Sequence, residues 1–203
     1  GDKYKLVMLC YRNAKNLQKD RIRKNEELRH RLDNRRVLEQ LQSDLRLKEK
    51  PRHIECFDNS NIQGTNPVAA CVVFRNAKPS KKEYRHFNIK TVEGPDDFAS
   101  MEEVVFRRYK RLKEEEQDFP QLIVIDGGKG QLSSARKSLE KLGLEHTIAI
   151  IGIAKRLEEI YFPGDSIPIY LDKRSESLKV IQQLRNEAHR FGINHHRNRR
   201  SKN

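Results

Sequence analysis

Leu122-Ile-Val-Ile-Asp-Gly-Gly-Lys-Gly130 is the stretch of sequence on which the fold prediction depends. Four consecutive apolar residues after Pro120 are typical of a short strand that is buried on both faces of a sheet. The glycines break this strand, and the apolar spacing that follows predicts a helix over about 131–142. The stretch therefore predicts a strand followed by a helix, which is the repeating unit of an α/β fold.

Upstream of this stretch the sequence predicts an antiparallel meander and one helix. The strands are expected at Ile54-Glu-Cys-Phe57, before a polar turn at 58–61, at Val68-Ala-Ala-Cys-Val-Val-Phe74 and at Tyr84-Arg-His-Phe-Asn-Ile89. Asp96 or Asp97 is a good N-cap for the helix, whose apolar residues fall on one face.

Downstream we expect a buried strand over 147–153, short strands over 160–162 and 167–171, and a helix over about 175–191. Antiparallel strands followed by βαβ crossovers predict an α/β fold, with a mixed sheet flanked by helices. The domain is expected to span residues 51–203 and to end in a basic tail.

The first 50 residues are expected to form a basic helical arm. They carry 15 Lys and Arg against 8 Asp and Glu, no Pro, and a single Gly at position 1. Leucines recur mostly at three- and four-residue steps, at Leu28, Leu32, Leu38, Leu41 and Leu45. Asp33 is a candidate break between two helices. The favoured interpretation is that the arm packs on the next domain; contact with DNA or another protein is the alternative, and both can hold.

The composition points to a polyanion partner. The 203 residues carry a net charge of +13, with a pI near 9.7 and a mean hydropathy of −0.89. Nucleic acid is the leading partner, and a protein with a merely basic surface is the alternative. No apolar run approaches the ~18 residues of a membrane span. Three cysteines without metal-ligand spacing argue against a disulfide scaffold or a zinc module and for a cytoplasmic setting.

Asp58 and Asp126 are the first candidates for chemistry, because each lies at the carboxyl end of a predicted strand. If the two strands are neighbours, the carboxylates meet at one edge and need a cation or a proton between them. Few, hard oxygen ligands suit Mg²⁺ or Mn²⁺, which in a basic protein suggests phosphodiester hydrolysis. The alternative is that both residues form turns or cap helices.

Three further sets of residues are weaker candidates. Lys129 lies in a glycine-rich turn that fails the P-loop pattern but could face a phosphate at a helix start. His189, on the last predicted helix, could bind a metal or move a proton, although a lone helical His is more often a surface residue. The basic tail offers DNA phosphate contacts through His195, His196, Arg197, Arg199 and Arg200.

Three motifs together closely resemble the carboxyl-terminal endonuclease domain of the UvrC family of bacterial nucleotide excision repair. They are Ile54-Glu-Cys-Phe-Asp-Asn-Ser60, Ile123-Val-Ile-Asp-Gly-Gly-Lys-Gly-Gln131 and Arg185-Asn-Glu-Ala-His-Arg-Phe191. The resemblance implies an RNase H-like fold and a Mg²⁺- or Mn²⁺-dependent cut of DNA on the 5′ side of a lesion. It further implies that Asp58, Asp126 and His189 are catalytic and hold the metal.

Other residues carry supporting roles or depart from the family pattern. The resemblance gives Asp97 a supporting role, and Lys129 and Lys155 are candidates to offset phosphate charge. Asn186 stands where the family often has Asp, and Asn59 where many members have Ile. The family's GIY-YIG nuclease, its UvrB-binding segment and its helix-hairpin-helix module are absent from these 203 residues, so we expect an excised fragment that binds DNA weakly by itself.

Two other functions compete with the nuclease. The first is a non-catalytic DNA-binding or assembly module on an RNase H-like scaffold, which would not need a carboxylate-held ion. The second is a generic basic RNA-binding protein, which the 7% aromatic content makes weaker because RNA platforms are rich in aromatic residues.

Overall fold

The computed structural model describes residues 1–60, 68–90, 92, 96–154 and 159–200, with the side chains of 60 and 194–200 outside the description. The helices are α1 (Asp2–Asp44), α2 (Asp97–Glu114), α3 (Lys129–Leu142) and α4 (Glu176–Arg200), with a 3₁₀ turn η1 (Lys81–Glu83). The strands are β1 (His53–Ser60), β2 (Val68–Arg75), β3 (Lys78–Pro79), β4 (Arg85–Asn88), β5 (Leu122–Asp126), β6 (Ala149–Ala154) and β7 (Glu159–Tyr161).

The chain divides into two compact units, Gly1–Val37 and Leu38–Asn203. The predicted break at Asp33 is wrong, because α1 continues without interruption through a segment that has neither Gly nor Pro. Leu28 and Leu32 in the first unit are exposed, whereas the leucines of the second unit that continue the pattern, Leu38, Leu41 and Leu45, are buried. None of the described helices combines the length and apolarity needed to cross a membrane.

The strands form one mixed sheet in the order β3-β2-β1-β5-β6-β7, and β4 also pairs with β2. The predicted meander is confirmed by the antiparallel pairing of β2 with both β1 and β4. The short β3 was missed because the turn before it places Asn76 and Ala77 at positive φ, and alanine is not a typical residue of such turns.

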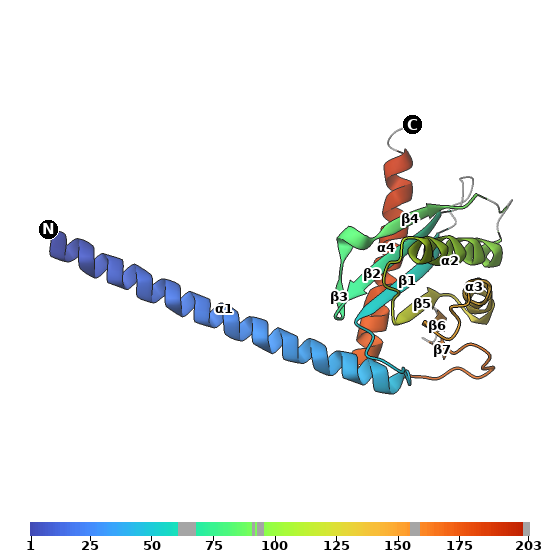
Figure 1. Ribbon diagram of the computed structural model, residues 1–203, viewed down its shortest axis with the longest axis horizontal. Helices are drawn as coiled ribbons and strands as arrows, with labels where there is room; N and C mark the ends of the chain where they lie inside the picture. The colour runs from blue at the N-terminus through green and yellow to red at the C-terminus, as the bar shows by residue number, and fades with distance from the viewer. Residues whose placement is uncertain (61–67, 91, 93–95, 155–158, 201–203) are drawn as a thin grey trace. The chain divides into compact units, whose positions relative to one another are not determined.

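Parallel pairing builds the other half of the sheet. β1 pairs with β5, and β5 pairs with β6, with α2 and α3 as the crossovers. Figure 1 shows α2 and α3 beside each other on one side of the sheet and α4 crossing the other side. The predicted mixed sheet with helices on its faces is therefore confirmed.

Three local predictions were wrong. Asp58 and Asn59 belong to β1 and not to a turn, because β1 stays paired with β2 as far as Ser60. The strand expected over 167–171 is a single bridge between Ile160 and Ile169. The last helix does not end near Phe191 but continues to Arg200, where basic residues suit the negative end of the helix dipole.

A buried carboxylate, Glu55, ties α2 to the sheet. Arg108 donates to its two oxygens at 2.7 and 3.2 Å, the Tyr109 hydroxyl donates at 2.8 Å, and His53 Nε2 lies 3.1 Å from Oε1. Burial raises the pKa of Glu55, but the hydrogen bonds and charges of His53 and Arg108 outweigh it and lower the pKa to about 2. Glu55 is therefore ionised in the folded protein.

We expect Glu55→Gln to lower the free energy of unfolding at neutral pH by about 3 kcal/mol, measured by urea denaturation. The folded pKa lies below the ordinary value of 4.5, so this contribution is complete above about pH 4.5 and is lost as the pH falls towards 2. The acid limb of the stability curve should flatten in the variant.

Glu83→Gln is the matched control for that experiment. Glu83 also has a pKa of about 2, through a hydrogen bond from Arg75, but its side chain is 28% exposed. Solvent screening should keep its loss under about 1 kcal/mol. Equal losses in the two variants would contradict a special role for the buried pair.

Candidate active site

The carboxylates of Asp58 and Asp126 lie on neighbouring strands at the same edge of the sheet. The last registered pair of β1 and β5 is Phe57 with Ile125, so the two aspartates occupy the next position on each strand. Neighbouring strands lie about 4.8 Å apart, and residues in register point to the same face. Phe57 and Ile125 pack in the α2/α3 core, so the aspartates point to the α4 face. Both are buried, at 1% and 3% exposure.

The third candidate, His189, joins this pair from α4. Its Nδ1 lies 3.1 Å from Oδ2 of Asp58, although 131 residues separate the two in sequence. The His189 side chain is 55% exposed and that of Asp58 is 1% exposed. The imidazole therefore connects a buried carboxylate to the solvent. Sequence reasoning selected these three residues. The structure brings His189 into contact with Asp58 and places Asp58 and Asp126 at neighbouring positions of β1 and β5.

Contacts on both sides of His189 hold this part of α4 against β4. Two residues before it, Glu187 accepts a hydrogen bond from the Tyr84 hydroxyl at 3.1 Å. Two residues after it, the Phe191 ring stacks on His86 with centroids 3.8 Å apart, and its carbonyl lies 3.0 Å from His86 Nε2. Sequence analysis missed this bracing, because its partners are about 100 residues apart in the chain.

The charges of the site shift the pKa of a neighbouring thiol, that of Cys56. Burial raises the pKa of Cys56 well above its usual range, and the charges of Asp126 and Asp58 raise it further. Arg185 acts in the opposite direction and lowers it. Arg185 lies one turn before His189 on α4, so its cation acts on the same region as the two carboxylates. The sequence analysis did not single out Arg185, although it is the first residue of the Arg185–Phe191 motif.

The glycine-rich turn after Asp126 allows two backbone segments to approach closely. The Gly127 N–H donates to the carbonyl of Ile153 at 3.0 Å, which ties the turn to β6. A Cβ on Gly152 would lie 3.0 Å from the Gly127 carbonyl oxygen. Lys129, the predicted phosphate ligand of this turn, donates to the Ser166 carbonyl and lies over the Tyr161 ring.

Of the other predicted site residues, only some have side chains that the structure describes. Asp96 is the N-cap of α2, accepting from the N–H groups of residues 98 and 99, so Asp97 is the first helical residue and not the cap. The Asp97 carbonyl accepts from Asn59 Nδ2 at 2.9 Å, which places α2 beside the end of β1. Lys155 lies outside the described residues. Arg197, Arg199 and Arg200 lie in the last turns of α4, with side chains outside the description.

The donor set suits a hard divalent cation in chemistry. Asp58 and Asp126 offer carboxylate oxygens from adjacent strands, and His189 offers an imidazole nitrogen. Within the described residues, however, no three His, Cys, Asp or Glu side chains are arranged closely enough to hold a metal ion. Asp58 and Asp126 occupy neighbouring positions of β1 and β5, and His189 contacts Asp58.

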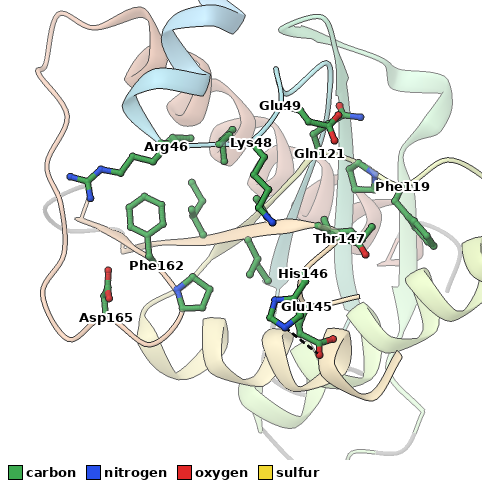
Figure 2. Close-up of a pocket in the computed structure, with 18 residues that line it drawn as sticks. Arg46, Lys48, Glu49, Phe119, Gln121, Glu145, His146, Thr147, Phe162 and Asp165 are labelled. Atoms are coloured by element: carbon green, nitrogen blue, oxygen red, sulfur yellow. Dashed lines mark ion pairs between the residues drawn. The ribbon is translucent and has the colours of Figure 1, made fainter. Parts of the chain in front are cut away.

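A separate cavity of about 810 Å³ lies at the opposite end of the central strands (Figure 2). Phe162 and Asp165 line one end of it, Phe119 and Thr147 line the other, and Lys48 extends toward the middle. It borders the amino end of β5, whereas Asp126 closes the carboxyl end, about 13 Å along the strand. None of the three candidate residues lines this cavity.

Comparison with known proteins gives consistent matches. A family model described as the UvrC RNase H endonuclease domain matches residues 42–193. The chain is 69% identical to the UvrABC system protein C of Christiangramia forsetii and 67% identical to that of Flavobacterium johnsoniae, over 202 residues in each. Each comparison covers 100% of this chain and 34% of the relative, so the chain spans about a third of its relatives' length.

Among solved structures, Endonuclease V from Bacillus subtilis aligns with a TM-score of 0.40 and 16% identity. The alignment covers 78% of this chain and 92% of that chain.

We expect Gly152→Ala to destabilise the domain by about 1–3 kcal/mol, because the new Cβ would press on the backbone of the turn after Asp126. Urea denaturation measures the loss. Gly128→Ala is the control, since no atom lies within 4 Å of its added Cβ, and it should change stability by less than about 1 kcal/mol. A Gly152→Ala protein as stable as this control would show that the turn can move freely.

Proposed function

The chain belongs to the UvrC RNase H endonuclease domain family, and we propose that it hydrolyses a phosphodiester bond of DNA on the 5′ side of a lesion in nucleotide excision repair. Family membership confirms the resemblance seen in the three motifs. The observation that carries the proposed chemistry is the pairing of two buried carboxylates on adjacent strands with an imidazole 3.1 Å from one of them.

In this proposal Asp58 and Asp126 hold Mg²⁺ or Mn²⁺ through their oxygens. The bound ion would lower the pKa of the attacking water and stabilise the charge that develops on the phosphate. The two strands fix the positions of both carboxylates. Because both are buried, little water competes with the ion for their oxygens.

His189 is proposed to orient Asp58 and to move a proton. An ionised carboxylate can only accept hydrogen bonds, so Nδ1 of His189 must donate to Asp58. In the neutral ring this leaves the lone pair on Nε2, which can then accept a proton from water or, once protonated, donate one to the leaving oxygen. The exposure of the ring suits this role, because 55% of the His189 side chain is accessible to solvent.

The proposed partners follow from charge and family. The net charge of +13 suits DNA, and Arg197, Arg199 and Arg200 are proposed to contact its phosphates. In the longer proteins of the family, UvrB is the proposed protein partner. A cytoplasmic setting is also proposed, and it suits the free thiols of Cys56 and Cys71.

Calorimetric titration with Mn²⁺ tests the metal site. We expect Mn²⁺ to bind to the native chain and not to an Asp58→Asn, Asp126→Asn double variant, because both carboxylate ligands become neutral amides. Asp58→Asn alone should reduce DNA cleavage at least about 100-fold with folding retained. Asp118→Asn, an exposed carboxylate before β5, is the control and should bind and cleave like the native chain.

Equal Mn²⁺ binding in the double variant and the native chain would contradict the site. The second candidate function, a non-catalytic DNA-binding module on the same scaffold, would then become the better explanation. It is favoured by the lack of a three-membered metal cluster within the described residues. Undiminished cleavage by Asp58→Asn would exclude the proposed mechanism altogether.

The role proposed for the end of α4 predicts a change in salt dependence. Replacing Arg197, Arg199 and Arg200 by Gln should weaken DNA binding and lower the slope of log affinity against log salt by up to about 3, since each lost phosphate contact contributes about 0.9. Fluorescence anisotropy at several salt concentrations measures this slope. An unchanged slope would remove these residues from the DNA interface.

A further inference from the structure

Phe98 is a large apolar residue that α2 exposes in its first turn, at 55% exposure. In the unit 38–203, the other large hydrophobic residues described as exposed are Ile167 and Tyr170. Tyr170 has a polar function there, since its hydroxyl donates to Glu159 at 2.8 Å. Phe98 has no polar atom in its side chain, so its exposed ring presents only apolar surface to the solvent.

Two contacts locate Phe98. Its backbone N–H donates to the Asp96 carboxylate at 3.0 Å, which places the residue in the first turn of α2. One edge of the ring lies against Gly130, where an added Cβ would come within 2.3 Å of Cε1 and 2.8 Å of Cζ. The ring can occupy this position only because residue 130 is a glycine. The last glycine of the Gly-Gly-Lys-Gly turn thus makes room for an aromatic side chain.

Two neighbours of Phe98 place it at the carboxyl ends of β1 and β5, on the α2 side of the sheet, whereas the two carboxylates point to the α4 side of the same edge. Gly130 lies four residues after Asp126, in the first turn of α3. The carbonyl of Asp97 accepts from the side chain of Asn59, the residue after Asp58. The ring therefore lies where the segments following both aspartates meet the amino-terminal turn of α2. It is an exposed apolar surface at the edge of the sheet where β1 and β5 end, the edge that also carries the two aspartates.

We propose that Phe98 stacks on an unpaired nucleobase of the DNA strand whose phosphate lies at Asp58 and Asp126. The inference rests on the proposed nuclease function and names how the strand is positioned. Base-aromatic stacking tolerates any base, because every base has a π-face. Such a contact suits an enzyme that must position a strand without reading its sequence, and it requires DNA that is unpaired next to the cut.

The test uses the 203-residue chain with Ca²⁺ in place of Mg²⁺ or Mn²⁺, so that a divalent cation still lies between the phosphate and the two carboxylates, and a gel checks that the DNA stays uncut. The probe is DNA with a short unpaired bubble that carries 2-aminopurine, and the fully paired duplex is the comparison. We expect the native chain to quench the 2-aminopurine fluorescence. Phe98→Ala should abolish this quenching and weaken binding to the bubble by about 5-fold to 150-fold, with binding to the duplex unchanged.

Three variants separate stacking from packing. Phe98→Leu keeps an apolar side chain without a π-face and should lose the quenching as Phe98→Ala does. Phe98→Trp should retain it. Tyr170→Leu, at an aromatic residue with 61% exposure, is the control and should quench like the native chain. Full quenching by Phe98→Leu, or tight bubble binding by Phe98→Ala, would overturn the proposal.

The failure of this inference can be told apart from the failure of the nuclease function. A chain that quenches 2-aminopurine through Phe98 but does not cut DNA with Mg²⁺ or Mn²⁺ supports the stacking and contradicts the nuclease. A chain that cuts DNA and binds the bubble equally well with or without the Phe98 ring contradicts the stacking alone.

Discussion

Parallel pairing between β1 and β5 is the constraint on which the candidate site depends. Backbone hydrogen bonds hold Ile54–Phe57 in register with Leu122–Ile125, and this register brings Asp58 beside Asp126. A shift of one residue in either strand would send one carboxylate to the opposite face of the sheet. Both strands are buried on both faces, which makes such a shift costly, because it would move apolar side chains out of two cores.

The same strand carries two buried carboxylates with different environments. Glu55 points to α2, whose Arg108 guanidinium and Tyr109 hydroxyl contact its oxygens, and the imidazole of His53 in the same strand contacts it too, so its charge is stabilised in the core. Asp58 points to α4, where His189 contacts it from a side chain that is more than half exposed. Strand alternation separates the two roles, since residues three apart lie on opposite faces. Glu55 thereby stabilises the fold, whereas Asp58 is connected to the solvent through His189.

Helix α4 links the stability of the domain to the geometry of the site. Leu178, Ile181, Leu184 and Ala188 are buried, so the helix is anchored along its length before it reaches His189. The contacts of Tyr84 and His86 then brace the turn on both sides of the histidine. This anchoring holds the backbone of His189 in the position from which its ring contacts Asp58.

The sequence by itself determined the central strands and the helices α2 and α3, and it singled out two aspartates and a histidine as candidates for the site. Apolar runs and helical periodicity are local patterns, and the three motifs are short segments. Only the tertiary structure decided that Asp58 ends up within a strand, that Glu55 binds Arg108 across 53 residues, and that Phe98 rests on Gly130. The physical reason is that burial, strand register and side-chain contacts depend on residues far apart in the chain, which no local pattern records.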